Sequence, residues 1–411
     1  MATFLLIIIY LAFISLGLPD SLLGVAWPVM QTDLSAPLET AGYLFMAIAG
    51  STIISSLISG RLLKRFGTGN VTFVSCLLTA CALLGFHFSP SVIWLFVCAI
   101  PLGLGAGAVD AGLNDYVATH YKAHHMSWLH CFWGVGATLG PVIMAQFISG
   151  QHSWTNGYLA IAGMQFLLVI ILLLTLPLWN KVTKKSHKGL NEQPGYTTDV
   201  TNHLEDGMNV KPLQIKGVKL AMLSFLFYCG VEATMGLWGS SFLVNVKDLD
   251  AAVAARWVSL YYGGITIGRF ITGFITFKMN NLTLIRIGQF IALVGAVLLF
   301  LPFPPVFSLI GFIMVGLGLA PIFPCMLHET PARFGKKHSQ TIMGYQMAIA
   351  YTGSTFIPPL LGFIASKSSI GIFPFCIVVF VVVMLFSSEK LNQLMKKKVT
   401  INKETSSAVS S

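Results

Sequence analysis

Long apolar segments separated by short polar ones make up most of the chain. A helix needs about 20 predominantly apolar residues to cross a bilayer. The pattern predicts two runs of such helices, at 3–30, 37–61, 70–88, 91–117, 127–150 and 156–178, and then at 218–245, 252–278, 282–302, 304–326, 339–365 and 369–388. The first segment has no basic flank and is longer than the apolar part of a signal peptide, so we count it as a transmembrane helix. The pattern therefore predicts an all-α membrane protein with twelve transmembrane helices in two six-helix bundles.

One long polar segment, 179–217, interrupts this pattern. It is rich in Lys, Asn, Thr and Gly and has no apolar period, as is typical of a flexible linker. We therefore expect an N-terminal bundle at 1–178, a linker at 179–217, a C-terminal bundle at 218–390 and a short basic, Ser-rich tail at 391–411.

The composition indicates that lipid is the solvent. Hydrophobic residues make up 55% of the chain and charged residues only 10%, whereas a soluble domain carries roughly 25% charged residues. The net charge of +10 comes from short basic runs between apolar segments. These runs lack interleaved aromatic side chains and do not predict nucleic-acid binding. All seven cysteines lie in apolar segments without a C-x-x-C pair, so we expect buried thiols and neither a metal site nor a cofactor.

Lys and Arg residues are concentrated on one side of the predicted membrane. If the N-terminus is cytoplasmic, all but three of the 25 Lys and Arg residues belong to cytoplasmic segments, and only Lys247, Arg256 and Lys367 lie outside. Cytoplasmic loops carry such an excess, and the opposite topology would reverse it. We therefore expect a multi-pass protein of the inner or plasma membrane with both termini, and the linker, in the cytoplasm.

The two halves of the chain share short sequence patterns. Three patterns of the first half recur in the second at nearly the same spacing: Gly103-Leu104-Gly105 with Gly316-Leu317-Gly318, Gly60-Arg61-Leu62 with Gly268-Arg269-Phe270, and Pro141 with Pro358. Each match connects one helix to the sixth helix after it. Parallel repeats of this kind build secondary transporters in which the substrate binds between the halves near the bilayer midplane.

Three acidic residues lie inside apolar segments: Asp20, Asp110 and Glu232. A charged side chain at the bilayer centre costs about 2.5–3.5 kcal/mol or more, so it usually faces a water-filled cavity and has a function. We interpret these acids as proton-coupling residues; the alternative is a fixed acid that hydrogen-bonds a neighbouring helix. Asp20 lies outward of its helix centre and Asp110 inward, so we expect the two carboxyl groups to lie apart and to act in turn.

Aromatic and polar residues near these acids are candidates for substrate binding. His130 and Trp133 are three residues apart and share a helix face. A Trp ring stacks well on the apolar face of a sugar, and a His hydrogen-bonds hydroxyl groups; ordinary helix packing is the alternative. Further candidates are Asn114, Tyr228, Trp238 and Gln346.

Glycines crowd the segments 91–117, 127–150 and 252–278. Small residues let helix backbones approach each other, so we expect these glycines to form helix contacts. The chain has no G-x-x-x-x-G-K-[ST] pattern, which argues against transport driven by ATP.

The run Gly60-Arg61-Leu62-Leu63-Lys64-Arg65-Phe66-Gly67 resembles the loop signature between the second and third helices of the major facilitator superfamily. The family usually has an acid where Lys64 stands. Asp115, at the end of the fourth helix, is an alternative partner for Arg61 or Arg65. By this resemblance we expect a conformational latch that comprises Arg61, Arg65, Asp115 and the repeat counterpart Arg269.

Within that superfamily the chain resembles the fucose:proton symporter family over nearly its whole length. The resemblance is carried by Pro19-Asp20-Ser21-Leu22-Leu23, by 103–105 with Asp110 and Asn114, by the run from His130 to Pro141, and by Tyr262-Gly263-Gly264 with Gly268-Arg269. It implies proton-linked acids at Asp20 and Asp110 and sugar contacts near His130 and Trp133. The chain departs from that family at Leu18 and Pro19, where paired asparagines are usual, in having Asp at 110 in place of Glu, and in lacking amides in the fifth helix.

These observations favour a monomeric transporter, with no enzymatic role, that moves a sugar-like solute together with protons. The first alternative is a proton-coupled drug or metabolite exporter, because Gly136-Ala137-Thr138-Leu139-Gly140-Pro141 looks like the start of an antiporter motif, although Met144 and Ala145 replace its next glycines. A membrane sensor without transport activity is the alternative from another class of protein.

Overall fold

The computed structural model describes residues 2–121, 123–149, 153–190, 212–276 and 278–409, and these residues are almost entirely helical. The first half contains α1 (Ala2–Asp20), α2 (Leu22–Asp33), α3 (Thr40–Phe66), α4 (Thr68–His87), α5 (Val92–His120), α6 (Ala123–Ile148) and α7 (Trp154–Leu190). The second half contains η1 (Pro212–Gln214), α8 (Val218–Lys247), α9 (Ala251–Ile275), α10 (Asn281–Phe300), α11 (Pro305–Leu319), α12 (Ile322–His328), α13 (Thr330–Phe334), α14 (Lys336–Lys367), η2 (Ile370–Ile372) and α15 (Phe373–Val409).

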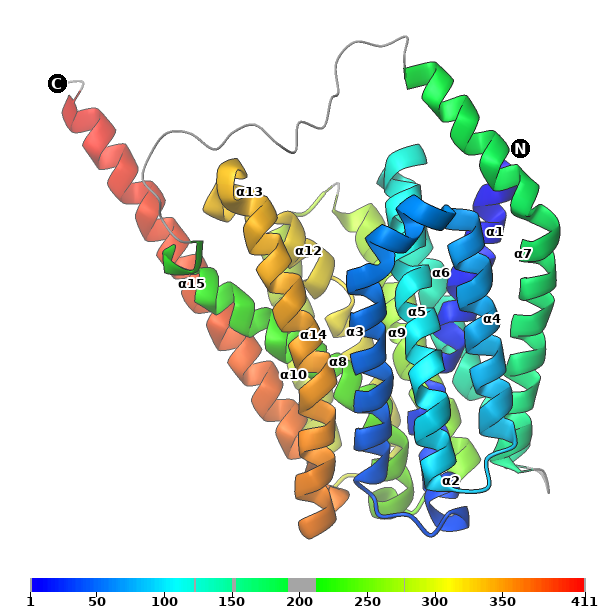
Figure 1. Cartoon of the computed structure of the whole chain (residues 1–411). Helices are drawn as coiled ribbons and strands as arrows, with labels where there is room; N and C mark the ends of the chain where they lie inside the picture. Colours follow the sequence, from blue (N-terminus) through cyan, green and yellow to red (C-terminus); the bar gives the residue numbers. More distant parts are fainter. Residues whose placement is uncertain (1, 122, 150–152, 191–211, 277, 410–411) are drawn as a thin grey trace.

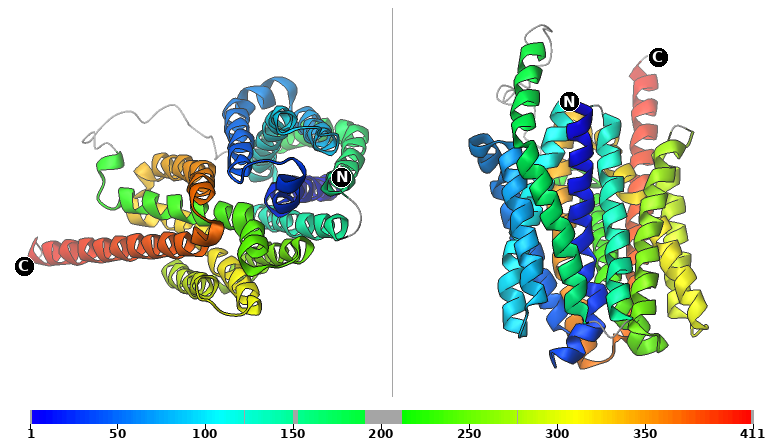
Figure 2. Two further views of the ribbon diagram at one scale, coloured as in Figure 1. Left: turned by 90° about the horizontal axis from the view of Figure 1, so that it is seen from below. Right: turned by 90° about the vertical axis from the view of Figure 1, so that its right-hand side faces the viewer.

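Each predicted span corresponds to one helix, or to one broken helix in the case of α1–α2 and α11–α12. Eleven segments of the described residues are long and apolar enough to cross a bilayer. The twelfth, α9, is less apolar because it carries Arg256 and Arg269 along with Tyr, Thr and Gly residues. The two six-helix bundles lie side by side (Figures 1 and 2), which confirms the predicted fold.

The break in the first membrane helix follows from Pro19. A proline has no N–H, so the carbonyl four residues earlier loses its helical hydrogen bond. That carbonyl, of Ser15, accepts a bond of 2.7 Å from the Gln165 side-chain amide, whose oxygen accepts one of 2.7 Å from the Thr79 hydroxyl. Asp20 is consequently the last residue of α1, directly before the turn at Ser21.

Glycines repeat the same helix contacts in both halves. In the first half, the backbone of α5 at Gly103 lies against the Ile48 carbonyl of α3. In the second, α11 at Gly316 lies against the Tyr261 carbonyl of α9. The step along the chain from Gly103 to Gly316 is the same as the step from Ile48 to Tyr261. The predicted match of the Gly-Leu-Gly runs is therefore confirmed as a match in packing.

A second pair of glycine contacts follows the same step along the chain. Gly105 approaches the Ser75 carbonyl of α4, and Gly318 approaches the Gly288 carbonyl of α10. A Cβ at Gly105 would lie 2.6 Å from the Ser75 oxygen, and a Cβ at Gly318 would lie 2.6 Å from the Gly288 oxygen. Only glycine allows helices to approach this closely, so the pseudo-symmetry depends on these positions.

The match of Gly60-Arg61 with Gly268-Arg269 does not agree with this packing. If residues of the two halves are matched with the offset that the glycine contacts give, the counterpart of Arg269 in the first half is Ser56 and not Arg61. Ser56 lies about one and a half helical turns deeper in the bundle than Arg61. Arg269 is therefore a residue of the helix bundle and does not belong among the loop charges that set the topology.

The halves are in contact at the end opposite the chain termini. There, a Cβ on Gly24 of α2 would overlap the Gly236 carbonyl of α8, and one on Gly42 of α3 would lie 2.8 Å from Pro359 Cα of α14. Toward the end with the termini, α14 and α15 lean away from the first half (Figure 1). The structure is therefore open on the side of the termini (Figure 1).

Helical structure extends into both segments that were predicted to be a polar linker and a polar tail. Helix α7 continues beyond the predicted span to Leu190, and α15 continues to Val409. Most of the remaining predicted linker, 191–211, lies outside the described residues.

Candidate functional site

Asp20 and Trp133 form a hydrogen-bonded pair on the side of the first half that faces the second. The Trp133 indole N–H donates to Asp20 Oδ2 over 2.7 Å. The Asp20 side chain is exposed, and Trp133 is half-buried. Gly17 of α1 packs directly on the backbone of α6 at Trp133, so the close contact of these two helices sets the distance between the acid and the ring.

Arg269 and Glu232 form an ion pair on the facing side of the second half. Arg269 Nη2 lies 3.0 Å from Glu232 Oε1 and 3.4 Å from the Tyr228 hydroxyl. The two charged side chains are 18% and 21% exposed. The Tyr261 hydroxyl donates to the Glu232 backbone carbonyl over 3.1 Å and so anchors α9 on α8.

The two pairs meet between the halves. The Arg269 guanidinium lies over the Trp133 ring, with its carbon 5.6 Å from the ring centroid. This is the geometry of a cation–π contact. We call Asp20, Trp133, Arg269, Glu232 and Tyr228 the inter-half site, because it contains a continuous chain of contacts from the acid of α1 to the ion pair of α8 and α9.

Asp20 and Glu232 are pseudo-symmetry counterparts. The Ile14 carbonyl of α1 packs on a glycine of α6, and the Leu226 carbonyl of α8 packs on a glycine of α14. Asp20 and Glu232 are separated by the same number of residues as Ile14 and Leu226. Gly24 of α2 and Gly236 of α8, which are in contact across the interface, are also separated by this number of residues. The two predicted acids therefore lie at equivalent places on either side of the crossing point of α2 and α8.

Asp110 has a different local partner. Asn114, one turn later on α5, donates its amide to Asp110 Oδ1 and to the Asp110 backbone oxygen, each over 2.9 Å. Asp20 and Asp110 are thus not hydrogen-bonded to each other, although they are close enough to interact electrostatically. Tyr351 of α14, 41% exposed, lies within electrostatic range of Asp110 from the other half.

His130 is exposed one turn before Trp133 and lies edge-on to Phe13, with ring centroids 6.1 Å apart. It is also within electrostatic range of Arg269. The structure thus places His130 beside the inter-half site.

Two other candidates for substrate binding lie in the core of the second half. Trp238 is fully buried and donates its indole N–H to the Pro358 carbonyl over 2.8 Å. Gln346 is 1% exposed and accepts a bond of 2.9 Å from the Thr330 hydroxyl. In this conformation both side chains join helices of the same half, and neither is part of the inter-half site.

The predicted latch residues are spread over two places. Arg61, Arg65 and Asp115 are exposed at the end of the termini. The ion pairs found within the described residues are Arg269–Glu232 and Arg286–Glu389, so Asp115 is not joined to either arginine here. A latch between these three residues stays a prediction for a conformation in which that end is closed.

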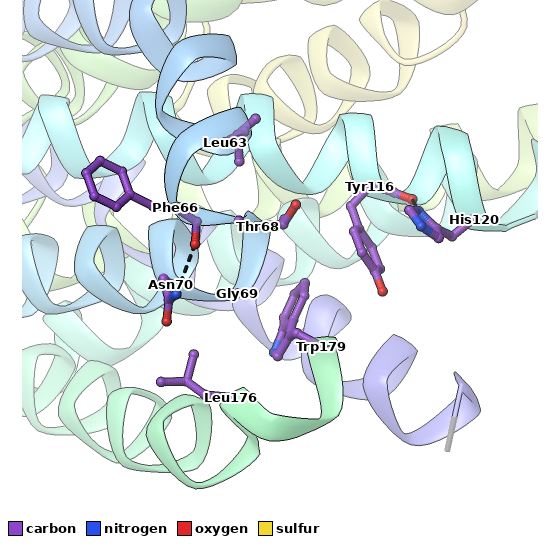
Figure 3. Close-up of a pocket in the computed structure, with 10 residues that line it drawn as sticks. Leu63, Phe66, Thr68, Gly69, Asn70, Tyr116, His120, Leu176 and Trp179 are labelled. Atoms are coloured by element: carbon purple, nitrogen blue, oxygen red, sulfur yellow. Dashed lines mark hydrogen bonds between the residues drawn. The ribbon is translucent and has the colours of Figure 1, made fainter. Parts of the chain in front are cut away.

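A separate cavity of about 320 Å³ lies within the first half, at the end of the termini (Figure 3). The turn between α3 and α4 forms one wall, and Tyr116, His120 and Trp179 form the other. Its lining includes Leu63, Phe66 and Gly67 from the signature run but no residue of the inter-half site. It is a feature of the loop between α3 and α4 and not of the space between the halves.

Sequence reasoning predicted Arg269 as a latch residue and not as a partner of Trp133 and Glu232, and it named neither Tyr262 nor Tyr351 as a site residue. Arg269 was counted with the loop charges, although a basic residue inside an otherwise spanning segment is itself a signal for function. Tyr262 lies within electrostatic range of both Asp20 and Glu232. Tyr351 carried no signal of its own, because a single Tyr in an apolar helix does not show which way the side chain points.

Twelve membrane helices in two pseudo-symmetric halves, with ionisable side chains between them, define a secondary transporter. Residues 9–358 match the model of the Major Facilitator Superfamily, and the chain belongs to this family. Among curated relatives, bypass of stop codon protein 6 of Saccharomyces cerevisiae is 24% identical over 92% of this chain and 80% of its own length. The glucose/mannose transporter GlcP of Bacillus subtilis is 23% identical over 76% of each chain.

Solved structures show the same architecture. The partially occluded inward open conformation of the xylose transporter XylE from E. coli matches with a TM-score of 0.70, over 94% of this chain and 98% of that chain. Its sequence identity to this chain is 12%, so this likeness concerns the fold alone.

Proposed function

We propose that this transporter moves a sugar, or a similar small polar solute, together with protons by alternating access. The observation that carries the proposal is the hydrogen bond between Trp133 and Asp20 at an accessible position between the halves. It places a flat aromatic face beside a carboxylate, with His130 one turn away. An aromatic face binds the apolar side of a sugar ring, and carboxylate and imidazole groups hydrogen-bond its hydroxyls.

The charges around the site favour an uncharged solute. Three carboxylates, of Asp20, Asp110 and Glu232, accompany one guanidinium, of Arg269, which is already paired. An anionic solute would meet like charges and no free cation among these four groups, and its desolvation would not be repaid. The low-identity relationship to a glucose/mannose transporter is consistent with a neutral sugar.

Asp20 and Asp110 are the proposed proton carriers. Both are acids within membrane helices, and neither is paired with a basic side chain among the described residues. Protonation removes their charge and with it the cost of enclosing them when the halves close. If the termini are cytoplasmic, as the Lys and Arg distribution predicts, the open side seen here faces the cytoplasm.

Two measurements test the proposal. Purified protein is heated with a panel of neutral sugars, sugar acids and drugs; a ligand at 100 times its Kd stabilises by about 2.7 kcal/mol. The ligand that stabilises is then used in proteoliposomes, where an inward proton gradient should accelerate its uptake and a protonophore should abolish that effect. Stabilisation by drugs alone, with proton-driven export, would instead establish the efflux alternative.

A further inference from the structure

The contacts of the inter-half site run without interruption from an acid of the first half to an ion pair of the second. Asp20 accepts from the Trp133 indole at 2.7 Å, Trp133 presents its ring to Arg269 at 5.6 Å, and Arg269 is bonded to Glu232 at 3.0 Å. Each step joins a different pair of helices: α1 with α6, α6 with α9, and α9 with α8. A change at Asp20 therefore has a physical route to the second half.

The middle step lies where α6 of the first half packs against α9 of the second. Helices α6 and α9 form the most extensive contact between the halves. A Cβ on Gly134, the residue after Trp133, would overlap the hydroxyl oxygen of Thr266, which is three residues before Arg269 on α9. The Trp133–Arg269 contact thus joins the two helices, one from each half, that share this extensive contact.

We propose that Trp133 transmits the charge of Asp20 to the second half: its ring holds Arg269, and with it α9, against α6 only while Asp20 is ionised. This inference rests on the proposed proton coupling and deepens it, because it names the residue through which a proton bound in one half changes the position of the other.

The physical reason lies in the bond between the indole and the carboxylate. A hydrogen bond to an ionised group is roughly twice as strong as a neutral one. The ionised Asp20 fixes the rotamer of Trp133 so that its face points at Arg269, and it also makes the ring more electron-rich. When Asp20 is protonated, the ring is released and the cation–π contact with Arg269 is lost. The halves are then free to close at the end of the termini.

Other titratable or charged groups belong to the inter-half site or lie beside it, and they enter the design of the test. They are Asp110 of α5, His130 of α6, Glu232 of α8, and Tyr262 and Arg269 of α9. A pH response must therefore be assigned to Asp20 by substitution. The Asp20→Asn variant should remove the response and fix the protein in its low-pH state, while a His130→Gln variant should keep it.

The test measures the opening of the protein by the distance between two spin labels. Gly60 of α3 and Gly344 of α14 lie on opposite halves at the end of the termini, and a Cβ at either position meets no atom within 4 Å. Cysteines at both, after replacement of the seven native ones, carry the labels. In the otherwise unchanged protein, lowering the pH should shift the distance distribution to shorter values.

Trp133→Phe is the decisive variant, because phenylalanine keeps an aromatic face but has no N–H. It should show the short distance at neutral pH, with the pH-dependent change reduced to less than about half. Arg269→Lys keeps the charge beside Glu232 but loses the flat guanidinium, and should reduce the response in the same way. If Trp133→Phe is too unstable to purify, the outcome for Arg269→Lys decides.

Trp154→Phe is the matched control. The Trp154 indole also donates to an aspartate, Asp33 Oδ2, over 2.8 Å, but both residues belong to the first half at the opposite end of the bundle. This variant should keep the full pH response. A full response in Trp133→Phe, or in Arg269→Lys where that variant decides, overturns this inference alone; a protein without any pH response overturns the proton coupling as well.

Discussion

Asp20 and Glu232 occupy equivalent positions of the two halves but have different partners. Asp20 accepts an indole N–H from Trp133, whereas Glu232 is paired with the Arg269 guanidinium. The pseudo-symmetry thus supplies two acids, and the second half neutralises its own with an arginine at a position where the first half has Ser56.

Replacement of Glu232 by Gln should affect stability more than coupling. Arg269 would lose its ionic partner inside the bundle, and leaving a buried charged group unsatisfied costs about 1–3 kcal/mol or more. We expect a lower melting temperature of the purified variant. The double variant Glu232→Gln, Arg269→Gln should recover part of that loss, because no uncompensated charge remains.

Replacement of Asp110 by Asn should abolish uptake driven by a proton gradient and spare the exchange of substrate across the membrane. Exchange needs no net change of protonation, whereas accumulation does. The measurement compares proton-driven uptake with counterflow in the same proteoliposomes. Accumulation against a concentration gradient by the variant would show that Asp110 does not couple protons. Asn114→Ala, which removes the amide bonded to Asp110, should weaken uptake but not abolish it.

Trp133 and Trp238 should respond differently to substitution. Trp133→Ala removes the ring proposed to stack on the solute, and the loss of about 0.5–1.5 kcal/mol of aromatic contact corresponds to roughly two- to tenfold weaker binding. Trp238→Phe removes the bond to Pro358 within the core, so it should lower the melting temperature and leave affinity unchanged. If a calorimetric titration gives the same solute affinity for the Trp133→Ala variant and the unchanged protein, Trp133 only packs between helices and does not bind the solute.

Gly24 is a sensitive position for the closed end. An added methyl group would overlap the Gly236 carbonyl, so Gly24→Ala should force α2 and α8 apart and reduce transport by more than about tenfold. Gly163→Ala is the matched control, since a Cβ at that helical position meets no atom within 4 Å. It should be neutral or slightly stabilising. The readout is transport rate together with the labelling of a cysteine near the closed end.

The predicted orientation has a direct test. A cysteine at Gly344, in a background without native cysteines, should react in intact cells only with a membrane-permeant reagent. A cysteine at Ser35, in the exposed turn between α2 and α3, should react with an impermeant reagent. The reverse labelling pattern would invert the topology and make the conformation described above outward-open.

The sequence alone determined the number, order and approximate ends of the membrane helices. A succession of about 20 apolar residues has few alternatives to a spanning helix, because a lipid environment leaves every backbone group to be satisfied internally. The repeat was also visible, since Gly103 and Gly316 are each required by the same close helix contact. The acids at 20, 110 and 232 were visible for a similar reason, because a carboxyl group is expensive in an apolar segment.

Only the tertiary structure decided which side chains meet. Whether Trp133 faces Asp20, and whether Arg269 belongs to the bundle or to a loop, depends on how far each helix is rotated about its axis and shifted along it. Those quantities follow from the contacts of small residues on several helices at once, such as Gly17 with Trp133 and Gly134 with Thr266. A local sequence pattern does not contain them, so the sequence did not show that Trp238 is buried against Pro358 or that Arg269 lies beside Trp133.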